Sequence, residues 1–246
     1  MSTVEFLVRA GREFRRGGWV FTGFHWPVLA GQLAHRLPGA EFTQAFEAGA
    51  STHEAGRLVP TSTTDYPAYG NALGYVADTA AVLLAMARRF DRVVLDAGNV
   101  DVLGRVNSSF IGERARPAVR LPGGGGAADV AAAARELVWL HGGTDLRRIH
   151  SRVEHVTAAP GPHALVRLHT RWGVARLRPE PVLEEVADVP GVDAFVAHLD
   201  GLGVRTSGAA ARERAQPGEL SAAVEVLRAA ADRGYAVARR ALAETS

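Results

Sequence analysis

Residues 120–135 read "RLPGGGGAADVAAAAR", so four consecutive glycines stand between a proline and an alanine-rich helical pattern. Glycine loses more conformational freedom on folding than any other residue, and a run of four therefore requires a reason. A glycine-rich turn that opens a helix exposes backbone N–H groups, which bind a phosphate or stabilise an oxyanion. The run matches neither the dinucleotide-binding spacing nor the P-loop spacing. Taken alone, it leaves open an anion-binding turn or a mobile loop without a ligand.

Helical and strand patterns alternate on both sides of this run. Strands are predicted at 19–23, 40–47, 92–98 and 136–142, and helices at 4–14, 27–37, 80–90 and 127–135. Such alternation favours an α/β fold with a largely parallel sheet. We therefore predict an open three-layer α/β/α sandwich with a mostly parallel sheet and a helical C-terminal tail.

The remaining segments complete the predicted domain. Further strands are expected at 152–161, 164–170 and 173–178, and a single long amphipathic helix at 219–244. Residues 50–70 are rich in Ser, Thr, Pro and Gly and predict a long loop, a feature that is usually functional or disordered. We expect one α/β domain over 1–205, with a linker and helix over 206–246 packed on it.

The composition excludes several kinds of chemistry. The 246-residue chain has no cysteine, and all 28 of its basic residues are arginine. Disulfides, a thiol nucleophile, a Schiff-base lysine and a P-loop lysine are therefore impossible. The nine histidines show no metal-ligand spacing such as HExxH, so no metal site is predicted.

Charge and hydropathy restrict the partners. The formal net charge is only +2, and no arginine-rich run is interleaved with aromatic residues, which argues against nucleic-acid binding. The N-terminal residues lack the apolar block of a signal peptide, and no apolar stretch approaches the ~20 residues that span a bilayer. We expect a cytoplasmic protein with no membrane association.

Five segments in register carry a resemblance to a known family. Residues 119–135, "VRLPGGGGAADVAAAAR", resemble the glycine loop of the β subunits of family I coenzyme A (CoA) transferases. The family's other motifs are similar, in the same order, to "FTGFHWPVLAGQLAHR" (21–36), "FEAGA" (46–50), "LDAGNVDVLGRVNSSFIG" (95–112) and "RVEHVTAAPG" (152–161). The likeness covers roughly residues 4–165 and does not extend over 170–246.

The resemblance implies a double-displacement reaction between an acyl-CoA and a carboxylic acid. A glutamate attacks the acyl-CoA, and the CoA thiolate returns to give a glutamyl-CoA thioester, from which an incoming carboxylate takes the CoA. A carboxylate needs no deprotonation to act as a nucleophile. Each step passes through a tetrahedral oxyanion, which requires preorganised N–H donors.

The resemblance assigns roles to particular residues. Glu47, in the first "EAG", matches the nucleophile, and Glu54, in the second, is its rival deeper in the loop. The glycines that match the oxyanion and CoA contacts are Gly123, Gly124, Gly125 and Gly126. CoA is expected only as substrate and product.

Two neighbouring segments carry further candidates. Asn99 stands where the family has Gln or Glu, so its amide either donates to the oxyanion or caps a turn. Asn107 keeps a family asparagine, whereas Arg105 replaces another. Gly23 fits the turn before the second helix, and His25 and Trp26 either line an acyl pocket or pack in the core.

Only the nucleophile-bearing half of such an enzyme is recognisable in this chain. We therefore expect a separate α-type subunit in a hetero-oligomer, with α2β2 as the expected form. Two alternatives stay open: an acyl-CoA hydrolase or ring-opening enzyme on the same fold, and a non-catalytic partner subunit.

Overall fold

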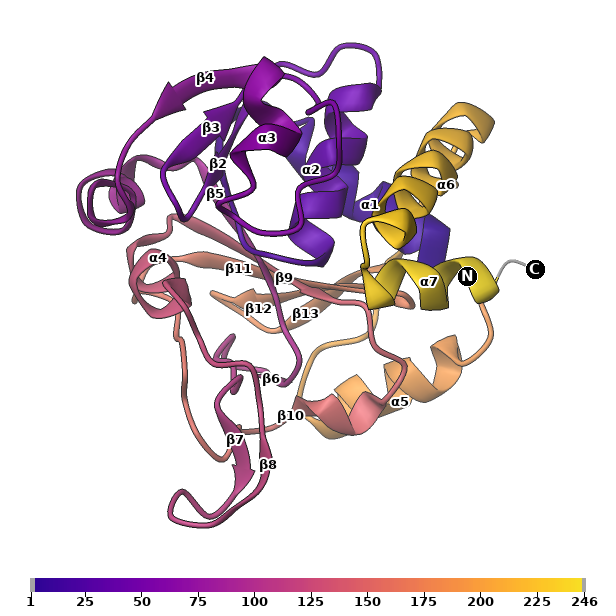
Figure 1. Ribbon diagram of the computed structural model, residues 1–246. Coiled ribbons are helices and arrows are strands. Elements are labelled where there is room, and N and C mark those ends of the chain that lie inside the picture. The colour runs from indigo at the N-terminus through magenta and orange to yellow at the C-terminus, as the bar shows by residue number, and fades with distance from the viewer. Residues whose placement is uncertain (1–2, 245–246) are drawn as a thin grey trace.

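The computed structural model describes residues 3–244, which form a ten-stranded sheet flanked by helices (Figure 1). The sheet order is β14-β13-β12-β11-β9-β5-β1-β2-β3-β4. Its five central strands all run parallel. They are β11 (Leu165–Thr170), β9 (Glu136–His141), β5 (Arg92–Asp96), β1 (Gly18–Thr22) and β2 (Phe42–Phe46).

Shorter strands extend both edges of this parallel centre. On the β11 side, β12 (Gly173–Arg178) and β13 (Val182–Val186) add antiparallel, and β14 (Ala210–Ala211) pairs parallel with β13. On the β2 side, β3 (Ala50–Thr52) and β4 (Leu73–Val76) add antiparallel. Because β4 ends the sheet order, its outer edge has no strand beside it among the described residues.

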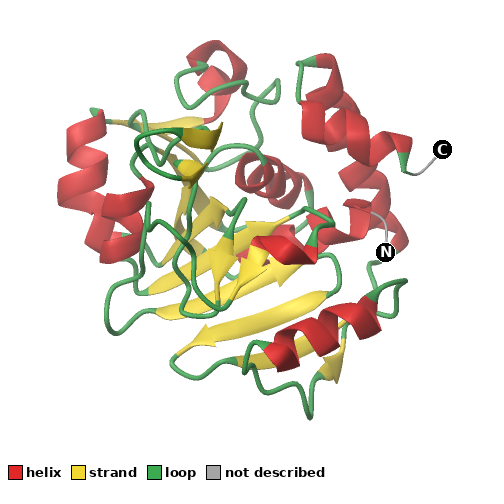
Figure 2. Ribbon diagram, turned by 90° about the horizontal axis from the view of Figure 1, so that it is seen from below, coloured by secondary structure: helices red, strands yellow, loops and turns green. Residues whose placement is uncertain are grey.

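Helices cover both faces of the sheet (Figures 1 and 2). One face packs against α1 (Thr3–Phe14), α2 (Trp26–Arg36), α6 (Pro217–Asp232) and α7 (Ala236–Ala243). The other packs against the π-helix η2 (Ala81–Met86), the short η3 (Ala87–Arg89), α4 (Ala127–Ala133) and α5 (Val192–Gly201). The predicted three-layer α/β/α sandwich is therefore confirmed.

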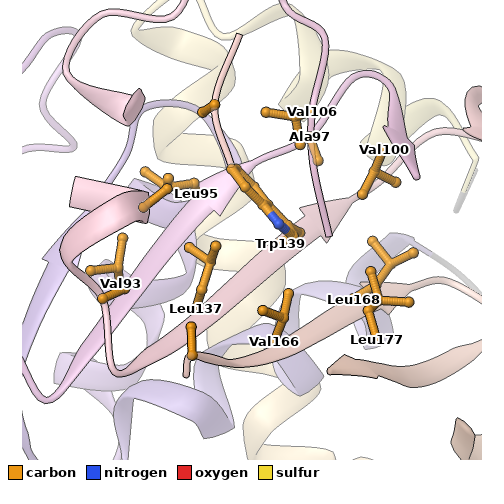
Figure 3. Packing of buried hydrophobic residues seen from close by; sticks show 14 of the residues in the cluster. Val93, Leu95, Ala97, Val100, Val106, Leu137, Trp139, Val166, Leu168 and Leu177 are labelled. Atoms are coloured by element: carbon orange, nitrogen blue, oxygen red, sulfur yellow. The ribbon is translucent and has the colours of Figure 1, made fainter. Parts of the chain in front are cut away.

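Side-chain alternation along the central strands produces the two cores. Leu95 and Trp139 belong to the core on the α4 side, where Figure 3 shows them together with Val93, Leu137 and Val166. Their neighbours Val94 and Val138 belong to the core on the α1 side. Parallel strands buried on both faces carry such nearly continuous apolar runs.

Small elements connect these layers near the carboxyl ends of the parallel strands. They are α3 (Tyr66–Tyr69), η1 (Gly70–Ala72), the parallel pair β6 (Val100–Asp101) and β10 (Ile149–His150), the hairpin of β7 (Phe110–Gly112) and β8 (Pro117–Arg120), and η4 (Leu146–Arg148). The β7–β8 hairpin projects from the body of the molecule just before the glycine run (Figure 1).

The C-terminal prediction was partly wrong. The single helix expected at 219–244 is two helices, because α6 ends at Asp232 and Gly234 adopts φ +94° before α7 begins. A residue in the left-handed conformation commonly ends a helix, and it is usually glycine because glycine has no Cβ. Both helices nevertheless pack on the α1 side of the sheet, with α6 against α1 and α2.

Three further differences concern strands and the linker. Residues 152–161 form bends with an isolated bridge at Ala158 instead of the expected strand. The stretch 206–218 contains β14 and the first two residues of α6. The elements β13 and α5, which the sequence patterns had not indicated, occupy part of the unmatched region after residue 170.

Among residues 3–244, every helix is too short or too polar to cross a membrane.

Candidate active site

The chain reverses its winding direction at β1, and a cavity opens there. From β1 the sheet continues to β2 on one side, and the chain later returns to β5 on the other. Ligands in open α/β sheets bind outside the carboxyl ends of the strands at such a switch point. A cavity of about 540 Å³ lies there, lined from these strand ends by Gly23, Glu47 and Asp96.

Glu47 directly follows β2 and is half-buried in this cavity. Its carboxylate oxygen Oε1 accepts a hydrogen bond from the backbone N–H of Gly126 at 3.2 Å. The chain turns at once, because Gly49 adopts φ +107° and donates its N–H to the Phe46 carbonyl at 3.0 Å. The two sequence-predicted features, the first "EAG" and the glycine run, are therefore brought into direct contact.

Three glycines of the run have close neighbours at the position that a Cβ would take. A Cβ on Gly125, whose φ is +51°, would lie 3.3 Å from Glu47 Oε2. A Cβ on Gly124 would lie 2.7 Å from the methyl group of Thr157, and one on Gly126 would lie 2.6 Å from Leu83. A methyl at Gly124 or Gly126 would therefore require Thr157 or Leu83 to shift, and one at Gly125 would press on the Glu47 carboxylate.

The N–H groups of the run have different partners. Gly123 donates to the Ser108 carbonyl at 2.7 Å, and Gly126 donates to Glu47. No described residue accepts a hydrogen bond from the N–H of Gly124 or Gly125. Two backbone donors of the run are thus available to a ligand, and one of them belongs to Gly125, which lies beside the Glu47 carboxylate. Oxyanion stabilisation uses backbone donors of this kind.

Asn99 lies in the same cavity, but its amide has structural partners. It is buried, its Nδ2 donates to the Asn107 carbonyl at 3.1 Å, and its Oδ1 accepts from Arg148 Nη1 at 3.0 Å. Asn107 is fixed in turn, because its Nδ2 donates to the Phe110 carbonyl at 2.7 Å. The Nδ2 group of Asn99 carries two hydrogens, and these contacts use only one of them.

Arg105, which departs from the family pattern, is accommodated by a neighbouring carboxylate. Its Nε donates to Asp101 Oδ2 at 2.8 Å, and Asp101 is fully buried. The backbone N–H groups of Leu103 and Val153 also donate to this carboxylate, at 3.0 and 3.1 Å. The turn is thus closed by an ion pair, and the guanidinium is directed away from the cavity lining.

Of the three residues predicted to line an acyl pocket, two line the cavity and one is buried in a hydrophobic core. Gly23 and His25 line the cavity, and His25 Nδ1 lies 3.5 Å from Asp96 Oδ2. Trp26 is buried in the α1-side core, with its ring edge-on to Phe6 at a centroid distance of 5.4 Å, and it does not line the cavity. The packing alternative describes Trp26.

His25 is also a backbone exception. Its φ is +61°, and it is the only non-glycine residue among residues 3–244 with a positive φ. Such a conformation costs about 1–3 kcal/mol and persists only where the surrounding structure imposes it. The residue immediately precedes α2, so the turn aims the imidazole into the cavity as the helix begins.

A buried histidine supports the loop on the opposite side of the cavity. His141 ends β9, and its Nδ1 bonds the Ala97 carbonyl at 2.8 Å. Burial lowers the pKa of His141, so the ring is neutral and Nδ1 donates. This contact holds the turn between β5 and Asn99. The sequence patterns had assigned no role to His141, Arg148, Leu83 or Thr157, although Thr157 lies within the segment 152–161 that resembles a family motif.

Glu54 lies outside the cavity, in an exposed bend of the loop after β3. The described residues also contain no group of three or more His, Asp or Glu side chains arranged to hold a metal ion.

The comparisons with known proteins agree on the type of fold. The chain matches no family model. It is 31% identical over 144 residues to the B-type subunit of 3-oxoadipate CoA-transferase from Pseudomonas knackmussii. The match covers 56% of this chain and 53% of that protein, so the similarity extends over about half the length of the relative.

Solved structures extend the similarity to most of the chain. Glutaconate coenzyme A-transferase from Acidaminococcus fermentans superposes with a TM-score of 0.77 at 18% identity, covering 90% of this chain and 92% of that one. The decarboxylase AibA/AibB superposes with a TM-score of 0.75 at 23% identity, covering 95% and 96%. The chain therefore has the fold of the CoA-transferase subunits, and in sequence it resembles a B-type subunit of that family.

Proposed function

We propose that this chain is the B-type subunit of a CoA transferase in which Glu47 carries the CoA as a thioester. The observation that carries the proposal is the contact between the Glu47 carboxylate and the glycine run, inside a cavity at the switch point of the sheet. The similarity to the B-type subunit of a 3-oxoadipate CoA-transferase supports it.

The reaction follows from a carboxylate nucleophile. A Glu47 oxygen attacks the thioester carbonyl of an acyl-CoA, the C–S bond breaks, and CoA leaves as the thiolate. The thiolate then attacks the Glu47 carbonyl of the mixed anhydride and releases the acyl group as a carboxylate. An incoming carboxylate attacks the resulting Glu47 thioester, and the same two steps in reverse deliver CoA to it and restore Glu47.

The backbone supports each of these steps. Every attack passes through a tetrahedral intermediate with a negative oxygen, and Gly125, whose N–H has no partner among the described residues, lies against the Glu47 carboxylate. Preorganised donors of this kind are worth about 10²–10³-fold in rate. The Gly126 N–H fixes one Glu47 oxygen, so the other is presented to the substrate.

A separate α-type subunit is part of the proposal. Leu83 of η2 lies against Gly126, whereas the next residue, Leu84, is 73% exposed. Tyr75 and Val76 on the outer strand β4 are also exposed. Apolar side chains gathered beside a candidate site are typical of a protein–protein interface, and we assign this surface to the partner. An α2β2 assembly and a cytoplasmic location remain predictions.

The alternative functions differ from CoA transfer in whether they need the Glu47 carboxylate. The fold also serves a decarboxylase, so it does not by itself select transfer. A hydrolase or ring-opening enzyme on this fold, or a non-catalytic subunit, needs no carboxylate held against the glycine run. The observed Glu47–Gly126 contact therefore favours transfer.

Trapping the thioester tests the proposal. The chain, purified together with the proposed α-type subunit, is incubated with an acyl-CoA and reduced with borohydride, which converts a glutamyl thioester to an alcohol. Peptide mass analysis should place the change in residues 41–57, at Glu47. Acyl-CoA hydrolysis without a trapped residue would move the protein to the hydrolases. Full turnover by the isolated chain would refute the need for a partner.

A further inference from the structure

The cavity that contains Glu47 also contains a guanidinium that no carboxylate closely neutralises. Arg148 is the only arginine among the described residues that line the cavity. Its nearest carboxylate oxygen, Asp145 Oδ2, lies 4.0 Å from Nε. Asp145 is already engaged, because its two oxygens accept from Arg147 at 2.9 and 3.0 Å. The hydrogen bonds from Arg147, together with the charges of Arg147 and Arg148, lower the pKa of Asp145 to about 2, so the carboxylate is ionised while its oxygens stay hydrogen-bonded to Arg147.

A chain of neutral amides orients this guanidinium. Arg148 Nη1 donates to Asn99 Oδ1, Asn99 donates to the Asn107 carbonyl, and Asn107 donates to the Phe110 carbonyl. Asn99 and Asn107 are both buried. An amide fixes the direction of a guanidinium without cancelling its charge, so Arg148 keeps donors and positive charge for an anion that enters the cavity.

The rest of the lining is largely apolar. Its apolar members include Phe21, Phe24, Leu95, Val106, Leu121 and Trp139. The charged groups that share the cavity are the Glu47 carboxylate and Asp96, which lies beside His25. An apolar cavity with a nucleophile and a separate oriented cation suits an acyl chain that ends in its own anion.

We propose that Arg148 binds the distal carboxylate of a dicarboxylic acyl group, and so selects dicarboxylic over monocarboxylic acyl substrates. The inference rests on the proposed function of Glu47 and adds the class of substrate. A guanidinium matches a carboxylate with two parallel N–H···O bonds, which gives direction as well as strength. Loss of a charged hydrogen-bond partner should reduce kcat/KM by roughly 10–100-fold.

The test compares matched donors in the complete enzyme. Succinyl-, glutaryl- and adipyl-CoA are assayed against butyryl-, valeryl- and hexanoyl-CoA, with wild type, Arg148→Met and Arg148→Lys. The wild type should prefer the dicarboxylic series. Arg148→Met should lower kcat/KM for the dicarboxylic donors by about 10–100-fold more than for the monocarboxylic donors, mainly through KM. Arg148→Lys should recover part of the loss, because it restores charge without the planar fork.

Two outcomes would overturn the inference and leave transfer intact. One is a wild type that uses both series equally. The other is an Arg148→Met variant that loses activity equally with hexanoyl-CoA, which would place the guanidinium on the phosphates of CoA. In that case the loss should vanish with hexanoyl-pantetheine, which lacks those phosphates.

Direct binding separates this inference from failure of the proposed chemistry. Adipic acid monoamide and hexanamide differ only in a distal carboxylate, and calorimetry measures their affinities without turnover. The monoamide should bind the wild type roughly 10–100-fold more tightly than hexanamide, and Arg148→Met should remove the difference. Equal affinities for the wild type would refute the role of Arg148 even if no thioester ever formed on Glu47.

Discussion

The tripeptide Glu-Ala-Gly occurs twice within ten residues, at 47–49 and 54–56, and the two copies have different surroundings. Glu47 follows a parallel strand, is half-buried in the cavity, and accepts the Gly126 N–H. Glu54 lies in an exposed bend beyond the short antiparallel strand β3. Identical residues thus acquire different surroundings, because only the first copy stands where a parallel strand meets the switch point of the sheet.

The glycines of the two copies differ as well. Gly49 adopts φ +107°, and a Cβ there would lie 1.8 Å from the Ala77 carbonyl oxygen. Gly56 has no positive φ, and its Cβ would lie 2.8 Å from the Ala68 carbonyl oxygen. The first glycine turns the chain sharply behind the carboxylate, and the second only allows close packing against α3.

The largest expected effect separates the two glutamates. Glu47→Gln should lower kcat by roughly 10⁴-fold or more, because a neutral amide is a far poorer nucleophile. Glu54→Gln is the matched control and should change the rate by less than about 3-fold, as an exposed substitution away from the site. Steady-state transfer assays on the complete enzyme measure both. The opposite ranking would show that the second copy carries the chemistry.

The second prediction compares how substitutions of Gly49 and Gly56 change the free energy of unfolding. Gly49→Ala should lower the free energy of unfolding by about 2–5 kcal/mol, because left-handed strain adds to a backbone clash. Gly56→Ala should lower it by about 1–3 kcal/mol, because only the clash operates there. Urea denaturation compares the two. Equal losses would mean that the turn at Gly49 is not the tighter constraint.

A third prediction concerns the glycine run, which Glu47 contacts and Glu54, outside the cavity, does not. Gly125→Ala should reduce kcat by about 10²-fold, since the new methyl displaces Glu47 by a fraction of an ångström and strains the loop. Gly98→Ala is a suitable control, because Gly98 lines the same cavity with nothing within 4 Å of its Cβ position. A similar loss in both variants would argue for a general disturbance of the cavity.

The smallest effect is a pH dependence at His35, which packs on the strand that precedes the first copy. Its ring stacks on Phe42 of β2 at a centroid distance of 3.9 Å, and the charge of His53, next to Glu54, also acts on it. Burial lowers the pKa of His35 to about 3, below the ~6.5 of an unfolded histidine. Between these values only the unfolded chain binds the proton, so stability falls as the pH falls below about 6.5.

Between pH 7.5 and 5.5 this histidine should remove about 1 kcal/mol of stability. Burial lowers the pKa of His141 and His169 too, so they add to the slope with the same sign. His35→Phe keeps the ring stack and should flatten the slope by the His35 share. Urea denaturation at the two pH values is the measurement, and an unchanged slope in the variant would assign the effect to the other histidines.

Local patterns were sufficient for the part of the fold that forms the site. The strands β1, β2, β5 and β9 were each predicted within a few residues, because each is an apolar run bounded by glycine or polar residues. The contact between Glu47 and the glycine run was implied by the family resemblance, and the structure contains that contact. The catalytic roles remain predictions.

The misses have physical reasons. The break between α6 and α7 depends on one left-handed glycine inside a pattern that is helical on both sides. Residues 152–161 look like a strand, but their hydrogen bonds go to single partners such as the Val106 carbonyl and Asp101. Arg148 was missed because only tertiary contact with Asn99 reveals it, 49 residues away in sequence.

The backbone conformation of His25 lowers the stability of the fold, whereas its side chain lines the candidate site. A glycine would adopt φ +61° without a steric penalty, so His25→Gly should relieve backbone strain of about 1–3 kcal/mol. The same change would delete the imidazole that lines the cavity beside Asp96. Selecting variants of this protein for heat resistance alone would therefore favour a residue that empties part of its own binding site.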